Sequence, residues 1–323
     1  MRSASGTTPS TELSDAARRS VRSGTLPVRV LPDGRSVVPF PLIVTPSRPR
    51  AMRPPPHRPG RRGAETHAPP RPGHTSRLER VFGKHPVRAV LRTRPTDVRR
   101  VVVLPGTDPV IDEIRHLALS AGVTPDVLPM DEFLRLARFT SDERQFRHQG
   151  VFAFADPRTI YGEQDLDLLA DGRIVLALDQ VSNPHNLAAI LRNAAFFGAD
   201  AILLLKNRSA DVTPSVVRVA VGGAEYVKIF KVINLARSLD MLKELGFSVY
   251  GLDERGERTL DEIEFGGKNV LVLGAEGEGL RQRTKKFSDV LVRIPAGRPG
   301  VESLNVAVAA AVALSRLPGP GHA

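Results

Sequence analysis

The segment Asn269–Leu280 reads NVLVLGAEGEGL, in which four apolar residues follow Asn269 and lead into a turn that contains three glycines. A short apolar run bounded by a turn is typical of a strand covered on both faces of a parallel sheet. The glycines let the backbone pass close to a ligand or to another backbone segment. We therefore expect a buried strand over 269–273 and, at its carboxyl end, a loop where open α/β sheets bind ligands.

The order of the glycines argues against a nucleotide phosphate as that ligand. It is G-x-x-G-x-G over 274–279, whereas dinucleotide-binding folds carry G-x-G-x-x-G, and the chain has no G-x-x-x-x-G-K-[ST]. Glu276 and Glu278 would repel a pyrophosphate at the following helix N-terminus. A ligand without phosphates suits the loop better, and a plain glycine-rich turn is the alternative.

Apolar runs and helical periods alternate on both sides of this segment. Further strands are expected over 174–178, 201–205, 227–230, 248–252 and 290–294. Helices are expected between them, over 186–197, 214–220, 235–245, 280–287 and 304–317. This alternation predicts a doubly wound α/β domain over 173–318.

A smaller unit precedes this domain. Helices are expected over 78–91, 110–121 and 131–139, and strands over 100–104, 125–128 and 151–155. Mixed helices and strands predict a small α/β domain over 76–156. Residues 157–172 are expected to form a linker.

Residues 1–75 differ in composition from the rest of the chain. They hold 14 of the 27 prolines, thirteen Arg, no Lys and four acidic residues, a net charge of +9 out of a total of +11. Proline-rich basic sequence without a hydrophobic period predicts a disordered arm. Three interpretations of the arm stay open: a non-specific RNA tether, an organellar transit peptide, or sequence upstream of a true start at Met52. Its acidic residues argue against the transit peptide.

Composition excludes several classes of protein. The chain has no cysteine and its eight histidines form no metal-binding spacing, so we expect no disulfide and no metal. No apolar run approaches the roughly 18 residues that span a bilayer, and no G-x-S-x-G nucleophile turn occurs. We expect a cytoplasmic protein whose chemistry needs positioning and a reactive cofactor.

Two further segments follow expected strands and carry polar residues. Residues 183–192 read NPHNLAAILR, with Asn186 near the start of a helix and Arg192 about two turns into it. An arginine there meets a carboxylate, a phosphate or solvent. Residues 294–305 read IPAGRPGVESLN and enter an alanine-rich helix, for which Ser303 is a plausible N-cap and Asn305 a first-turn residue.

Together these segments resemble the signature motifs of the SpoU/TrmH class of RNA ribose 2′-O-methyltransferases. The motifs are N-P-H-N-x-x-x-x-x-R-x-A-x-x-x-G over 183–198, G-A-E-G-E-G-L over 274–280 and I-P…S-L-N over 294–305. Residues 76–156 resemble the L30e-like substrate-binding domain that often precedes this class, through VFGKHPV at 81–87 and HQG at 148–150. The resemblance is strongest to RlmB-type enzymes, which methylate guanosine in large-subunit rRNA.

The resemblance implies an α/β fold with a deep trefoil knot at its C-terminal end, whereas the strand pattern alone predicts an open sheet because knots are rare. It implies S-adenosylmethionine as the cofactor, held in the knot largely by backbone groups of Gly274, Ile294 and Leu304. It also implies a homodimer packed through the knot helices and an RNA substrate, either a guanosine of rRNA or a tRNA.

The same resemblance implies roles for polar residues. Arg192 orients the ribose hydroxyl or helps to deprotonate it, assisted by an RNA phosphate or a shared network, because a guanidinium stays protonated and is a poor base. Four more residues position the reacting groups: Asn186, Glu276, Ser303 and Asn305. The loop after Ile294 departs from the class, since it is slightly longer than usual and has Ala296 where Met is frequent.

Two other functions remain open from the sequence. A non-catalytic RNA-binding or ribosome-assembly factor can have the same fold, although the presence of Asn186, Arg192, Glu276 and Asn305 argues against it. A nicotinamide-dependent oxidoreductase is disfavoured by the order of its glycines.

Overall fold

The computed structural model describes residues 29–30, 36–37, 78–137, 148–298, 300 and 303–318. The chain divides into two compact units, Met1–Arg71 and Pro72–Ala323. In the first unit, β1 (Arg29–Val30) and β2 (Ser36–Val37) pair antiparallel. The rest of the expected disordered arm over 1–75 lies outside the described residues.

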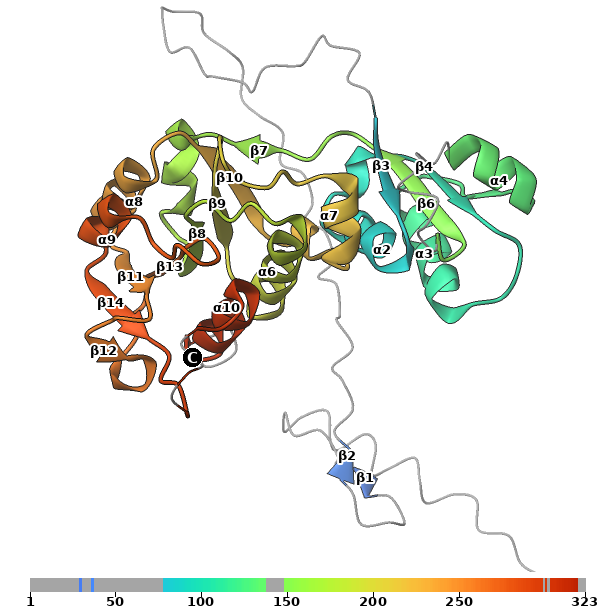
Figure 1. Ribbon diagram of the computed structural model, residues 1–323. Coiled ribbons are helices and arrows are strands. Elements are labelled where there is room, and N and C mark those ends of the chain that lie inside the picture. Colours follow the sequence, from blue (N-terminus) through green and yellow to red (C-terminus); the bar gives the residue numbers. More distant parts are fainter. Residues whose placement is uncertain are drawn as a thin grey trace, which may run out of the picture. The chain divides into compact units, whose positions relative to one another are not determined.

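The second unit begins with a small domain built on a four-stranded sheet of order β3-β6-β4-β5 (Figure 1). Its strands are β3 (Glu79–Phe82), β4 (Val98–Val103), β5 (Asp126–Val127) and β6 (Val151–Ala155). Its helices are α2 (Lys84–Thr93), α3 (Pro109–Ser120) and α4 (Met130–Ala137), with a short 3-10 turn η2 (Pro95–Asp97). Both β3 and β4 pair antiparallel with β6, and β5 is parallel to β4.

Alternate residues of β4 enter two cores, one on each face of this sheet. Val101 and Val103 pack with residues of α2 and α3, whereas Val102 packs with Phe133 of α4 and Phe152 of β6. This alternation is the period of two that a strand imposes on its side chains. The small sheet is therefore covered by helices on both faces.

The helix expected over 78–91 is wrong in its first part. Residues Glu79–Phe82 form a strand, and the helix begins only at Lys84. Gly83 has a φ of 92°, outside the helical region, and so ends the strand before the helix starts. Apolar residues at 78, 81 and 82 also suit a short strand, so their spacing did not discriminate between the two.

The large domain contains an eight-stranded, fully parallel sheet of order β12-β14-β11-β13-β8-β9-β10-β7. The strands are β7 (Ile160–Tyr161), β8 (Ile174–Leu178), β9 (Ala201–Leu205), β10 (Lys228–Val232), β11 (Ser248–Leu252), β12 (Arg258–Thr259), β13 (Asn269–Leu273) and β14 (Val290–Arg293). The helices are α6 (Pro184–Phe196), α7 (Pro214–Val219), α8 (Leu235–Glu244), α9 (Gln282–Phe287) and α10 (Val306–Leu314). Three 3-10 turns complete it: η3 (Glu163–Leu169), η4 (Gly223–Glu225) and η5 (Leu260–Glu262).

Helices cover both faces of the large sheet, as the continuous apolar runs predict. Ile174, Leu176 and Leu178 of β8 belong to the core under α6, α7 and α10, whereas Val175 and Ala177 belong to the core under η3 and α8. Figure 1 shows α8 and α9 on one side of the strands and α6 and α10 on the other. The expectation of a doubly wound α/β domain is confirmed.

The segment 157–172, expected as a linker, contains two elements of the large domain. The strand β7 pairs with β10 at the edge of the sheet, and Leu166 and Leu169 of η3 are fully buried. None of the described helices has the length and hydrophobicity that a bilayer crossing requires.

Candidate active site

A cavity of about 720 Å³ opens at the carboxyl ends of β11, β13 and β14. The loop after β11, the glycine-rich loop after β13 and the loop between β14 and α10 line it. These strands are neighbours in the sheet, so the loops that follow them meet at one edge. The volume lies within the range of small-molecule sites, roughly 300–1,000 Å³.

The glycine-rich loop is folded tightly on itself. Ala275 and Gly279 exchange two backbone hydrogen bonds of 3.1 and 3.0 Å. A Cβ on Gly274 would lie 2.1 Å from the carbonyl carbon of Gly279, a distance that no side chain tolerates without movement of the backbone. The close approach that the glycines predict is therefore an approach of the loop to itself.

An ion pair between a buried carboxylate and a partly exposed arginine holds the far end of this loop. Asp179, which follows β8 and is fully buried, accepts hydrogen bonds from the backbone N–H (3.2 Å) and Nε (2.7 Å) of Arg281. Loss of Arg281 would leave the buried Asp179 carboxylate without its charged partner, which is costly. The sequence pattern does not predict this pair, because the two residues are 102 positions apart and their opposite charges alone do not indicate a contact.

Three polar residues from separate segments form one hydrogen-bonded network, and two of them, Glu276 and Asn305, line the cavity. Asn305 Oδ1 caps α10, accepting from the backbone N–H of Ala307 (2.9 Å) and Val308 (3.4 Å). Asn305 Nδ2 donates to Asn186 Oδ1 (3.1 Å) and to Glu276 Oε1 (3.2 Å). Asn186 Nδ2 also donates to Glu276 Oε1.

The helix cap fixes the polarity of this network. Because Asn305 Oδ1 is engaged by backbone N–H groups, its Nδ2 must face Asn186 and Glu276. Asn186 then presents its oxygen to Asn305 and its amide nitrogen to Glu276, so the carboxylate accepts from both amides. Asn186 is 7% exposed, so the network is largely shielded from water on the side of α6.

Ser303 is not the N-cap of the last helix. The cap is Asn305, and α10 begins at Val306, two residues later than expected. The Ser303 side chain instead lines the cavity, together with Gly274, Ile294 and Leu304. The three residues expected to hold the cofactor thus surround one cavity.

Arg192 lies apart from these residues. It is on the exposed side of α6, does not line the cavity, and makes no hydrogen bond or ion pair with any other part of the chain that the structure describes. The structure therefore brings together Asn186, Glu276 and Asn305 but leaves Arg192 outside the cavity of its own chain.

The loop after β11 contributes polar residues that the motifs do not include. Asp253, whose side chain is 5% exposed, forms an ion pair of 2.6 Å with Lys285, and both line the cavity. The position of Asp253 directly after an expected strand is the signal that points to it. This position predicts a place in the site only once the strand order is known, because the order puts β11 beside β13 and β14.

Two family models match the chain. The SpoU rRNA Methylase family matches residues 173–315, and RNA 2′-O ribose methyltransferase substrate binding matches residues 80–161. The 23S rRNA (guanosine-2′-O-)-methyltransferase RlmB of Acinetobacter baylyi is 39% identical over 243 residues, covering 73% of this chain and 95% of the relative. RlmB of Escherichia coli K12 is 37% identical over 243 residues, covering 73% and 96%.

Solved structures agree with this assignment. A TrmH-family structure from Porphyromonas gingivalis superposes with a TM-score of 0.57 at 27% identity, covering 74% of this chain and 88% of that one. The SpoU methyltransferase AviRb from Streptomyces viridochromogenes, in complex with AdoMet, shares the fold with a TM-score of 0.59 at 22% identity and covers 74% and 88%. The chain belongs to the SpoU rRNA methylase family and carries that family's RNA substrate-binding domain before its methylase domain.

Proposed function

We propose that the chain transfers a methyl group from S-adenosylmethionine to the ribose 2′-hydroxyl of a guanosine in 23S rRNA. The observation that carries this proposal is the network of Asn186, Glu276 and Asn305, one residue from each motif, at the wall of a cavity of suitable size. The RlmB relatives, which are 23S rRNA guanosine methyltransferases by name, support rRNA over tRNA as the substrate. Such a substrate places the chain in the cytoplasm.

The cavity suits S-adenosylmethionine in size and charge. Its walls include the apolar residues Leu273, Leu280 and Val292, together with Gly274 and Ile294. Four acidic and two basic side chains line it, which favours a cationic ligand without phosphates: Asp253, Glu254, Glu276, Glu278, Arg255 and Lys285. When bound there, the cofactor supplies an electrophilic methyl group.

The chain's own residues act by holding the reacting groups in place. Glu276, fixed by the two amides, and Ser303 form the polar wall that faces the methyl donor. Arg192 holds the ribose hydroxyl and an adjacent RNA phosphate. A guanidinium is already protonated and is a poor base. Arg192 therefore orients the hydroxyl, assisted by the RNA phosphate or a shared polar network, and the proton leaves to solvent as the methyl group is transferred.

We also propose that the protein works as a homodimer packed through α6 and α10. These two helices lie against each other and expose large apolar side chains: Phe196 of α6 is 82% exposed and Val308 of α10 is 48% exposed. Exposed apolar patches of this kind are typical of protein interfaces. A second copy packed on this surface also accounts for Arg192, which lies on α6 outside its own cavity.

The trefoil knot is part of the same proposal. The last strand, β14, lies between β11 and β12, whereas α10, which follows it, packs on α6 and β13. Described residues of the segment between β14 and α10 and the glycine-rich loop line one cavity. This path supports a threaded arrangement in place of an open sheet.

The replacement Arg192→Ala tests the proposed function. We expect methyl transfer to 23S rRNA to fall by a factor on the order of 100 or more, while binding of S-adenosylmethionine, measured by titration, stays as in the unmodified chain. Arg237→Ala is the matched control, since Arg237 is an exposed arginine on α8, on the other face of the sheet. Equal activity of Arg192→Ala and the unmodified chain contradicts the proposal, as does a purified chain that neither binds the cofactor nor methylates rRNA.

A further inference from the structure

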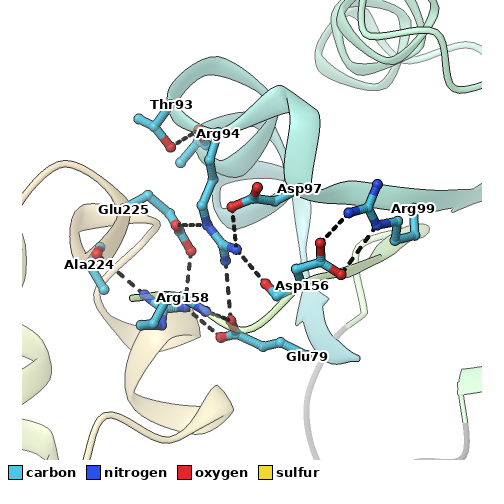
Figure 2. Close-up of polar contacts among 10 residues, drawn as sticks. Glu79, Thr93, Arg94, Asp97, Arg99, Asp156, Arg158, Ala224 and Glu225 are labelled. Carbon is cyan, nitrogen blue, oxygen red and sulfur yellow. Dashed lines mark hydrogen bonds and ion pairs between the residues drawn. The ribbon is translucent and has the colours of Figure 1, made fainter. Parts of the chain in front are cut away.

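Two arginines and two glutamates form a closed ring where the small and large domains meet (Figure 2). Arg94 follows α2 and donates to Glu225 of η4 (2.8 Å) and to Glu79 of β3 (3.1 Å). Arg158, in the segment after β6, donates to the same two carboxylates, at 3.0 Å for Glu225 and 2.6 Å for Glu79. Each of the four carboxylate oxygens thus accepts a hydrogen bond from one of the two guanidinium groups. The two positive and two negative charges leave the ring neutral as a whole.

The ring is largely buried, and each arginine also donates to a backbone carbonyl. The side chains of Glu225 and Arg158 are 2% and 9% exposed. Arg94 also donates to the carbonyl of Asp156 (2.5 Å), and Arg158 to the carbonyl of Ala224 (3.3 Å). Burial lowers the pKa of the Arg94 guanidinium, but the hydrogen bond and negative charge of Glu225 outweigh burial and raise that pKa above its ordinary value. Displacing one member of such a network would leave a buried charge unpaired, which is costly, so the network restrains the relative placement of its members.

The backbone before Glu225 is held in an unfavourable conformation. Val221 has a φ of 55°, in the left-handed region that β-branched residues avoid. The next residue, Gly222, has a φ of 83°, and a Cβ added to it would lie 2.8 Å from Ala89 Cβ and 3.0 Å from the carbonyl oxygen of His85, both on α2. Strained backbone persists where the surrounding contacts over-determine it, and it clusters at functional sites.

The following residue touches the helix that carries Arg192. A Cβ added to Gly223 would lie 2.8 Å from the carbonyl oxygen of Leu191 and 3.0 Å from Arg192 Cα. Within two residues, therefore, the backbone contacts α2 of the small domain and the backbone of Arg192 in α6. Where backbones pack this closely, the two domains cannot shift toward each other without steric clashes.

We propose that residues Val221–Glu225 form a rigid joint that fixes the substrate-binding domain relative to Arg192, and that Glu225 is a positioning residue for the RNA. The inference rests on the proposed function, because that function assigns Arg192 to the ribose. RNA held by the small domain then presents its ribose at a set distance from Arg192. Misplacement by about 1 Å can cost on the order of 100-fold in rate.

Glu225→Gln tests the joint by removing the charge while keeping the shape of the side chain. We expect kcat/KM for 23S rRNA to fall at least about tenfold, with the affinity for S-adenosylmethionine unchanged. The matched control is Asp156→Asn, which breaks the more exposed pair of Asp156 with Arg99 inside the small domain (Figure 2) and leaves both values unchanged. Full kcat/KM in Glu225→Gln, or a parallel loss of cofactor binding, overturns the proposal.

A distance measurement tests the joint without RNA. Because the chain has no cysteine, spin labels can be attached through Ser120→Cys on α3 and Asp240→Cys on α8, both exposed, and diluted with unlabelled chain so that only distances within one chain contribute. We expect one narrow distance distribution in the unmodified and Asp156→Asn backgrounds and a broad one with Glu225→Gln. Equal distributions in all three overturn the joint.

The two measurements separate failure of the joint from failure of the proposed function. If the chain does not methylate 23S rRNA but its distance distribution broadens with Glu225→Gln, the proposed substrate is wrong and the proposed joint stands. If Glu225→Gln does not fold, Arg158→Lys replaces it, because lysine keeps the charge but lacks the fork that reaches both carboxylates. The same outcomes then decide the proposal.

Discussion

Asn305 combines a structural and a chemical task in one side chain. Its oxygen caps α10, and its nitrogen reaches Asn186 and Glu276. The last helix therefore begins at the residue that completes the polar network of the cavity. Removal of this side chain is expected to affect both stability and activity.

Asn305→Ala is predicted to lower the free energy of unfolding by about 1 kcal/mol through loss of the cap and also to reduce methyl transfer sharply. Asn234→Ala removes a cap of the same residue type from α8, where Asn234 accepts from the backbone N–H of Arg237. Denaturant unfolding and methyl transfer are measured on both. The assignment of Asn305 to the site is contradicted if the two variants lose activity equally.

At the level of elements, the glycine-rich loop is the part of the site with the least room for change. Gly274→Ala places a Cβ against the backbone of Gly279. We predict that the loop is displaced and that affinity for S-adenosylmethionine falls by about tenfold or more, which corresponds to about 1.4 kcal/mol. Gly267→Ala is the control, since a Cβ there meets nothing within 4 Å; unchanged affinity in both would contradict the proposed binding site.

The closing turn of the small domain is predicted to be pH-sensitive. His148 lies against Phe133 with ring centroids 5.0 Å apart, and its Nδ1 accepts from the backbone N–H of Gly150 (3.0 Å). Burial lowers the pKa of His148, so the folded state favours the neutral ring. The resulting stability is present above the unfolded-state pKa of about 6.5 and is lost as pH falls through the lower folded-state pKa.

Unfolding of the chain and of His148→Asn over a series of pH values measures this contribution. Asparagine keeps an acceptor for Gly150 but does not titrate. The stability difference between the two proteins should be constant above pH about 6.5 and shift against the unmodified chain below it. Parallel curves across this range would show that His148 does not titrate in the way described.

The elements that sequence predicts well are those with a strong local pattern. The strands over 174–178, 201–205, 248–252 and 269–273 match to the residue, because each is a short, mainly apolar run that ends at a polar residue or a glycine. The meeting of Asn186, Glu276 and Asn305 follows from the motifs of the family. Contacts such as Asp179 with Arg281 and the ring around Glu225 depend on strand order and domain packing, which a local pattern does not contain.

For the whole molecule, the apolar surface of α6 and α10 leads to a prediction about assembly. Phe196→Lys places a charge in the proposed interface and should convert the dimer into a monomer, measured by light scattering at several concentrations. Ile233→Lys is the control, because Ile233 is 74% exposed and follows β10, away from α6 and α10. A monomeric unmodified chain, or a dimer unaffected by Phe196→Lys, would contradict this interface.

The central claim is that this chain methylates a guanosine ribose in 23S rRNA. The most direct measurement is a map of 2′-O-methylated nucleotides in rRNA and tRNA from cells without the gene, complemented by the unmodified chain or by Arg192→Ala. We predict that one 2′-O-methylguanosine of 23S rRNA is lost with the gene, returns with the unmodified chain and stays absent with Arg192→Ala. An unchanged rRNA map, or a loss confined to tRNA, would contradict the claim.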